Sequence, residues 1–304
     1  MKWTPGGSDE DIEDIRGSSP ARGGGGGGTA LKLGGGGAVV AILLAIVSQV
    51  LGVDLTGGSS TTTSSQPQSS QSSKRSNSSN QSGRPPDPAT DPDRDLKEFS
   101  KFAFNDAQKT FEAMFAKENV PYRHAKLVIF TDAVDTGCGE SSSAVGPFYC
   151  PPDEKVYIDL SFYRELKNQL GADGDFAQAY VIAHEMGHHL QTLLGIDDKA
   201  RRMVAKDKRR ENDVSVRQEL QADCFAGVWG HTTDQRKMLE SGDVEEAMNA
   251  AKSIGDDRLQ KMSGRRVNPE TFTHGTSEQR MRWFKRGFDS GSFDQCDTFG
   301  VAQP

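Results

Sequence analysis

Two histidines and a glutamate in the middle of the chain have a spacing that suits a hydrolytic metal centre. The stretch Ala183–Leu190 contains His184, Glu185 and His188 in the pattern His-Glu-x-x-His. Residues four apart lie on one face of an α-helix, so both imidazoles can reach one zinc ion at about 2.0–2.1 Å. Glu185, beside the first histidine, can take a proton from a metal-bound water. The pattern predicts His184 and His188 as zinc ligands and Glu185 as the general base.

The residues around this pattern predict the helix that must hold it. Apolar residues recur at helical spacing from Phe176 to Leu194. Asp173 and Asp175 precede them and Gly195 follows, as is typical of a helix start and a helix end. We therefore expect a helix over these residues with the histidines in its middle. A polar stripe on a surface helix is the alternative, but it does not explain the apolar neighbours.

A second acidic pair can complete the metal site. Glu219 lies 31 residues after His188, and Asp223 follows it four residues later on a helix predicted at Val214–Trp229. A catalytic zinc usually has three protein ligands and one open position, so Glu219 is the predicted third ligand. Asp223 is predicted to accept the N–H of a ligand histidine and to fix its tautomer. A solvated helix face is the alternative for this pair.

With these two motifs the chain resembles the putative neutral zinc metallopeptidase family of bacteria, which belongs to the gluzincin-like zincins. The resemblance covers nearly the whole chain except the low-complexity linker. It implies an α+β, zincin-like metallopeptidase domain, mostly helical with a small sheet, and one Zn²⁺ per chain. The segments that carry it are His184–His189, Glu219–Gly227, Met1–Trp3 and residues 146–151, 155–160 and 273–280.

Two further assignments concern the substrate. The resemblance implies that Val156, Tyr157, Ile158 and Asp159 form an edge strand that pairs with the substrate backbone. An ordinary core strand is the alternative. His274 lies in a polar turn before a predicted helix and is a candidate donor to the oxyanion of the tetrahedral intermediate. A helix cap or a contact behind the zinc ligands are the alternatives for His274.

The first third of the chain does not have the composition of a folded domain. Residues 1–33 are charged and Gly-rich, and we expect no fixed structure there. Residues 34–55 are largely apolar and long enough for a transmembrane anchor. A signal peptide is the alternative, but the preceding segment is too long for it. Residues 56–94 are rich in Ser, Gln, Asn and Pro and predict a flexible linker. Residues 95–304 remain for the metallopeptidase domain.

The distribution of basic residues predicts the orientation of this anchor. Four Lys or Arg residues precede residue 34, and none follows until Lys74. Because the basic flank of a membrane helix stays inside the cell, the N-terminus is predicted to be cytoplasmic. The protein is then a single-pass protein of the cell (inner) membrane, with its catalytic domain in the periplasm or outside the cell.

The cysteines agree with export. Cys138, Cys150, Cys224 and Cys296 all follow the predicted anchor, and four cysteines allow three pairings. Cys138 and Cys150 bracket a short loop, so we expect them to bond to each other and Cys224 to bond to Cys296. A free buried thiol is the alternative for Cys224.

Composition and motifs together define the predicted function. The net charge of −7 argues against a nucleic-acid partner, and the basic stretch 199–210 is interpreted as a solvated loop. The sequence predicts a membrane-anchored zinc peptidase that acts on a peptide or protein through a zinc-activated water and a glutamate base. The alternatives are a catalytically weak zincin-fold binding module and a zinc hydrolase of a non-protein amide. A helix at 96–118 and a strand at 126–130 are expected within the domain.

Overall fold

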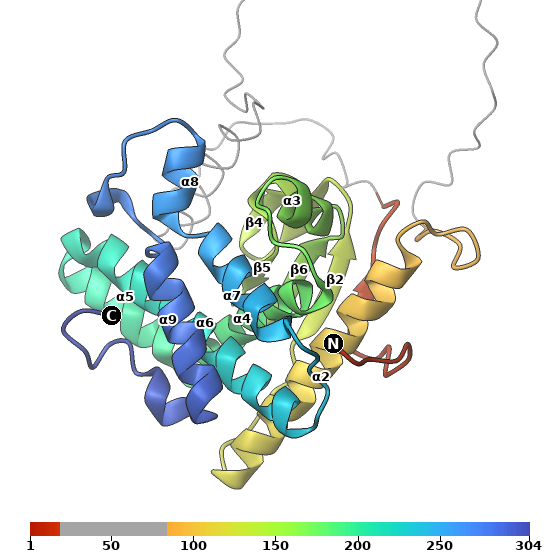
Figure 1. Cartoon of the computed structure of the whole chain (residues 1–304), viewed down its shortest axis with the longest axis horizontal. Helices are drawn as coiled ribbons and strands as arrows, with labels where there is room; N and C mark the ends of the chain where they lie inside the picture. Colours follow the sequence, from red (N-terminus) through yellow and green to blue (C-terminus); the bar gives the residue numbers. More distant parts are fainter. Residues whose placement is uncertain (19–83) are drawn as a thin grey trace, which may run out of the picture.

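The computed structural model describes residues 1–18 and 84–304 (Figure 1). The predicted anchor, residues 34–55, lies outside the described residues, as does most of the predicted linker at 56–94. Among the residues that are described, no helix combines the length and the apolar character that a membrane crossing requires.

A small mixed sheet forms one part of the domain. Its strand order is β1-β2-β6-β5, with β1, β2 and β6 parallel and β5 antiparallel to β6. A separate antiparallel hairpin is formed by β3 and β4. The strands predicted at 126–130 and 155–160 are confirmed. The bounds are β1 Ile12–Asp14, β2 Lys126–Phe130, β3 Ala133–Thr136, β4 Gly139–Ser142, β5 Phe148–Cys150 and β6 Lys155–Asp159.

Strand β2 is apolar from Leu127 to Phe130 because both of its faces are covered there. Leu127 and Ile129 belong to the main core, which the helices complete. Val128 and Phe130 belong to a second cluster with Val134 of the β3–β4 hairpin. Successive side chains of a strand point to opposite faces, so a strand buried on both sides has a continuous apolar run.

Strand β6 is an interior strand, contrary to the prediction that Val156, Tyr157, Ile158 and Asp159 form a substrate-binding edge. It pairs with β2 along its whole length and with β5 over residues 155–157. Ile158 is fully buried in the core. The carboxylate of Asp159 accepts the backbone N–H groups of Asp132 and Ser161, at 2.9 Å each, and so fixes two local turns. The free edge of the sheet on this side belongs to β5.

Helices make up most of the rest of the described chain, so the predicted α+β class with a small sheet is confirmed. The motif helix α4 packs against α2, α6 and α7, and α6 packs along α9 (Figure 1). The basic stretch 199–210 is not a loop, because α5 covers most of it. The bounds are α2 Arg94–Lys117, α3 Phe162–Asn168, α4 Asp175–Leu193, α5 Ile196–Lys206, α6 Glu211–Gln235, α7 Asp243–Ser253, α8 Asp256–Met262 and α9 Ser277–Ser290.

The first 18 residues are folded onto the domain, which corrects the prediction that residues 1–33 lack fixed structure. Trp3 packs on Phe99 of α2, with ring centroids 5.1 Å apart. Strand β1 extends the sheet beside β2. The guanidinium of Arg16 lies between the carboxylates of Asp14 and Asp91 at 2.7 and 2.6 Å. The charged residues of this segment form specific ion pairs with the domain, which composition alone does not reveal.

The position of β1 conflicts with the predicted single-pass topology. A single membrane crossing by residues 34–55 would place residues 1–18 and residues 84–304 on opposite sides of the bilayer. Strand β1 is hydrogen-bonded to β2 in register Ile12–Leu127, so the two segments lie on the same side. A cytoplasmic N-terminus combined with an exported domain is incompatible with this fold.

Candidate active site

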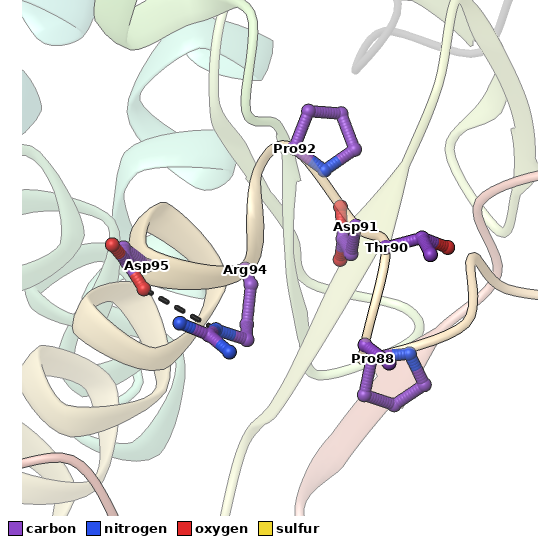
Figure 2. A pocket seen from close by; sticks show the side chains of 7 residues that line it. Pro88, Thr90, Asp91, Pro92, Arg94 and Asp95 are labelled. Carbon is purple, nitrogen blue, oxygen red and sulfur yellow. Dashed lines mark hydrogen bonds and ion pairs between the residues drawn. The ribbon is translucent and has the colours of Figure 1, made fainter.

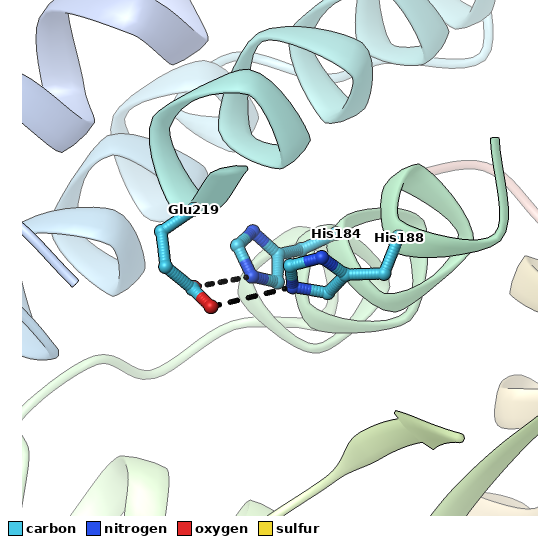
Figure 3. Close-up of side chains that lie close together, drawn as sticks. All are labelled: His184, His188 and Glu219. Atoms are coloured by element: carbon cyan, nitrogen blue, oxygen red, sulfur yellow. Dashed lines mark hydrogen bonds and ion pairs between the residues drawn. The ribbon is translucent and has the colours of Figure 1, made fainter. Parts of the chain in front are cut away.

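Helix α4 presents the predicted ligand pair from its buried middle. His184 and His188 lie one turn apart, and their ring centroids are separated by 4.9 Å (Figure 3). His184 is 5% exposed, Glu185 is 8% exposed, and His188 is more accessible than either. The helix therefore presents two imidazoles and one carboxylate in a region from which most water is excluded.

Helix α6 brings Glu219 to these imidazoles. Its carboxylate lies 3.2 Å from Nε2 of His184 and 3.5 Å from Nε2 of His188 (Figure 3). The approach of the two helices depends on Gly187, because a Cβ atom there would lie 2.9 Å from Cα of Ala222. A glycine in the first motif and an alanine in the second thus allow the close contact that assembles the three groups.

The inner nitrogen of each histidine is held by a partner. Nδ1 of His184 lies 2.9 Å from Oδ1 of Asp223, the partner that the sequence predicts. Nδ1 of His188 lies 2.9 Å from the side-chain oxygen of Gln191. Both inner nitrogens therefore act as donors, and both Nε2 atoms are left to face Glu219.

Asp223 is itself part of a buried network that the sequence did not predict. Its carboxylate accepts two hydrogen bonds from Arg280 of α9, at 2.8 and 2.9 Å, and one from the hydroxyl of Tyr180. Tyr180 lies four residues before His184 on the same helix face, so its spacing was an available signal. Arg280 is 57 residues from Asp223, and no local pattern links the two.

The charges of the cluster favour a positive charge between the two helices. Burial opposes the charged form of His184, but the charge and hydrogen bond of Asp223, helped by Glu219, raise its pKa to about 10. Burial also opposes the charged form of Glu219, yet the two neighbouring histidines hold its pKa well below the usual range. Burial raises the pKa of Glu185, although both histidines act in the opposite direction.

The three predicted ligands fit a zinc ion. One ligand atom from each of His184, His188 and Glu219 lies within 4.8 Å of the others. Two imidazoles and a carboxylate are the ligand set of a group of catalytic zinc sites, which keep the fourth position open. Fixed partners on both inner nitrogens, as found here, are a general feature of histidine ligands of metals.

His274 is buried and is held by Asp256. Its Nδ1 lies 3.2 Å from a carboxylate oxygen of Asp256, and its backbone N–H donates to the other oxygen of the same group at 2.7 Å. Burial opposes protonation, but Asp256 and the charge of Glu219 raise the pKa of His274. The hydroxyl of Thr273 is a second partner of Nδ1, at 2.9 Å. Asp256, which orients this ring, was not singled out from the sequence.

The neighbouring histidine has a structural environment. His189 is fully buried, its Nδ1 lies 3.0 Å from the hydroxyl of Tyr149 on β5, and its Nε2 lies 2.7 Å from the carbonyl oxygen of Arg123. His189 therefore ties the edge strand β5 to the motif helix and is not directed at the ligands.

Both predicted disulfides are present. Cys138 is bonded to Cys150 at the end of β5, and Cys224 of α6 is bonded to Cys296 near the C-terminus. Disulfides form and persist in oxidising compartments, so they indicate a domain outside the cytoplasm.

A separate hollow lies away from this centre. It has a volume of about 260 Å³ and is lined by residues 88–92 and by the first two residues of α2, Arg94 and Asp95 (Figure 2). Its charged pair, Arg94 and Asp95, is exposed at the surface. None of the predicted site residues lines this hollow, so it does not compete with the α4–α6 site.

Comparison with known proteins gives a family. A family model described as putative neutral zinc metallopeptidase matches residues 1–299. The chain is 49% identical over 303 residues to the uncharacterized protein YpfJ of Escherichia coli (strain K12), with 99% of each chain covered. It is 42% identical over 192 residues to the uncharacterized protein Rv2575 of Mycobacterium tuberculosis (strain H37Rv), covering 60% of this chain and 64% of that protein. No solved structure gave a significant match. The chain belongs to the putative neutral zinc metallopeptidase family.

Proposed function

We propose that this protein is a zinc-dependent peptidase in which His184, His188 and Glu219 hold one zinc ion. The observation that carries the proposal is the convergence of their ligand atoms within 4.8 Å. Glu185 follows His184 directly on helix α4. When bound, zinc polarises the scissile carbonyl and lowers the pKa of a coordinated water toward about 7.

Glu185 is the proposed general base. Burial raises its pKa, which brings it closer to the range in which a carboxylate both takes up and releases a proton. The carboxylate takes a proton from the attacking water and then delivers it to the leaving amine. Its place beside His184 in the sequence keeps it next to the metal without making it a ligand.

His274 is the proposed donor to the developing oxyanion. Asp256 engages its Nδ1 and leaves Nε2 for a substrate oxygen. The raised pKa of His274 favours the imidazolium form, which can donate from both nitrogens at once. A fixed donor in a buried site stabilises negative charge more strongly than water does.

Strand β5 replaces β6 as the proposed pairing strand for the substrate. It is the last strand of the sheet beyond β6, and within residues 1–18 and 84–304 only its inner edge is paired. Tyr149 links it to the motif helix through His189. An extended peptide at the outer edge would pair with β5 as a further strand, through hydrogen bonds to its outward-facing backbone groups.

The proposed membrane contact must agree with the position of β1. Residues 34–55 are largely apolar and long enough for one crossing. Residues 1–18 and the domain lie on the same side of the membrane. We therefore propose that residues 34–55 contact the membrane from that side. The enzyme would then act on peptides or proteins near a membrane surface outside the cytoplasm.

The test compares the full-length protein with its Glu185→Gln variant. We measure bound zinc per chain and cleavage of casein and of a peptide library. The full chain is needed because residues 1–18 are part of the fold. One zinc in both proteins and cleavage by the wild type alone is the expected result.

Other outcomes separate the alternatives. Zinc in both proteins without cleavage by either favours a binding module or a hydrolase of a non-protein amide. A folded wild type that binds no zinc would remove the assignment of His184, His188 and Glu219.

A further inference from the structure

A chain of buried side-chain amides leads away from the zinc ligand His188. Its first member is Gln191, whose side-chain oxygen lies 2.9 Å from Nδ1 of His188. The amide nitrogen of Gln191 donates to the side-chain oxygen of Gln221 at 3.1 Å. The amide nitrogen of Gln221 donates to the carbonyl oxygen of Cys296 at 2.9 Å. Gln191 and Gln221 are 0% and 5% exposed, so water does not replace these bonds.

Backbone carbonyls fix the direction of every bond in this chain. The carbonyl of Cys296 can only accept, so Gln221 must turn its NH₂ group toward Cys296 and its oxygen toward Gln191. The nitrogen of Gln191 also donates to the carbonyl of Gln218 at 2.8 Å, which independently requires the same orientation. The oxygen of Gln191 therefore faces His188, and His188 must donate from Nδ1. Nε2 is then the nitrogen that is free to bind a metal.

The far end of the chain is held by a disulfide. Cys296 is bonded to Cys224, which lies three residues after Gln221 on α6, with the two Cα atoms 5.5 Å apart. Both sulfur-bearing residues are fully buried. The bond keeps the carbonyl of Cys296 beside Gln221. Arg217 adds a second attachment by donating to the carbonyl of Thr298.

We propose that Gln191 and Gln221 are positioning residues for zinc. They hold His188 in the tautomer and ring orientation of a ligand, and the Cys224–Cys296 disulfide anchors their relay. This inference rests on the proposed zinc site, since it assigns a role to residues that touch His188 or act through it.

The experiment measures zinc affinity of the full-length protein by competition with a chromogenic chelator. Replacing Gln191 by Met keeps the side-chain length and removes its three hydrogen bonds. Gln221→Met likewise keeps the length and removes the two hydrogen bonds of Gln221. Loss of partners behind a metal ligand typically weakens binding about 10–100-fold, and we expect a weakening in this range for Gln191→Met. Gln221→Met should weaken binding in the same direction by a smaller factor.

The chain offers a matched control on the same helix. The side chain of Gln218 bonds to Asp197 and takes no part in the relay, which uses only its backbone carbonyl. Gln218→Met should leave zinc affinity within about twofold of the wild type. The Cys224→Ala/Cys296→Ala variant should weaken zinc less than Gln221→Met does, because Arg217 still holds the C-terminal segment.

A relay in series makes a distinctive prediction for the double variant. Once Gln191 is replaced, Gln221 has no route to His188, so Gln191→Met/Gln221→Met should bind zinc as Gln191→Met does. Zinc affinity that is unchanged in Gln191→Met, or weakened in the double variant by the product of the two single effects, would overturn the relay. Failure of the wild type to bind zinc would instead remove the proposed function itself.

A spectroscopic measurement remains informative where a variant does not fold. Long-range ¹H–¹⁵N spectra of the zinc-loaded wild type should show His188 protonated at Nδ1, with slow exchange of that proton. Gln221→Met should accelerate this exchange, while Gln218→Met should not. Zinc bound through Nδ1 of His188 in the wild type would contradict the proposed role of Gln191.

Discussion

Asp223 and Arg280 form a buried ion pair with two parallel hydrogen bonds directly behind His184. The two N–O distances are 2.8 and 2.9 Å, and the residues are 0% and 1% exposed. Burial acts to raise the pKa of Asp223, but Arg280 and His184 outweigh it and lower the value to about 2. Arg280 thereby keeps Asp223 ionised, and the carboxylate can accept the N–H of His184.

The first prediction is that Arg280→Met destabilises the fold and weakens zinc binding. Removal of one partner leaves the charge of Asp223 buried without compensation, which typically costs about 3–5 kcal/mol in the free energy of unfolding. Denaturant unfolding and chelator competition measure the two effects. Arg280→Lys is the control, because it retains the charge but not the paired N–H geometry, and an intermediate loss is expected. An unfolding free energy equal to that of the wild type in Arg280→Met would contradict this account.

The second prediction concerns the contact between α4 and α6. Gly187→Ala should destabilise the protein by about 1–3 kcal/mol, because its Cβ atom would meet backbone atoms of Ala222 at 2.9–3.0 Å. At an unobstructed helix position, Gly→Ala stabilises a protein by about 0.5–1 kcal/mol. The close contact and ordinary helix propensity therefore predict stability changes of opposite sign. The helices would separate, and Glu219 would move from the histidines. Thermal unfolding and zinc content provide the measurement, and a more stable variant with full zinc would refute the close-contact argument.

The third prediction tests the role of His274 in the reaction. His274→Gln should lower kcat by about 10²–10³-fold, the usual effect of removing one oxyanion donor, while zinc content stays at the wild-type level. His231→Gln is the matched control, since His231 lies on α6 and contacts the carbonyl of Phe288. Steady-state kinetics on a cleaved peptide distinguish the two variants. Equal kcat values for His274→Gln and the wild type would assign the ring to structure alone.

The candidate metal-binding residues could be recognised in the sequence because their spacing within each helix is local. His184 and His188 are one helical turn apart, and so are Glu219 and Asp223, and in each case the helix alone puts both side chains on one face. The link between the two pairs rested on the third protein ligand that a catalytic zinc usually has. Asp223 as the partner of His184 followed from the usual support of a histidine ligand.

The contacts that the sequence did not predict are made between distant segments. Arg280 reaches Asp223 from another helix, and Gln221 reaches Cys296 across 75 residues. The interior position of β6 depends on β5, which has three residues and too short a pattern to detect. Composition also did not reveal that residues 1–18 are folded. Their charged side chains are typical of a solvated segment, and only the structure shows their ion-pair partners on the domain. Tertiary partners, not local propensities, decide these features.

The fourth prediction is that acid releases the N-terminal strand. Burial acts to raise the pKa values of Asp14 and Asp91, but their bonds to Arg16 lower both below the ordinary value of 3.8. A carboxylate whose pKa is lower in the folded state stabilises the fold fully when the pH is above its pKa in the unfolded state. This stabilisation is lost as the pH falls through the pKa of the folded state. Hydrogen-exchange protection of β1 should therefore be constant from about pH 7 to pH 5 and fall below about pH 4. In Arg16→Met the protection should already be low at neutral pH and depend less on acid. Protection that is unchanged in this variant would show that the ion pairs do not hold the strand.

The fifth prediction is that the N-terminal segment and the catalytic domain are exposed on the same side of the membrane. Thr4 and Ser241 are exposed and belong to these two parts. Thr4→Cys and Ser241→Cys should react equally with a membrane-impermeant maleimide in intact cells or spheroplasts, because β1 and β2 share one sheet. Lysed cells provide the control for reactivity of both thiols. Labelling of Ser241→Cys in intact spheroplasts, with Thr4→Cys labelled only after lysis, would restore the single-pass topology and require β1 to leave the sheet in the membrane-bound protein.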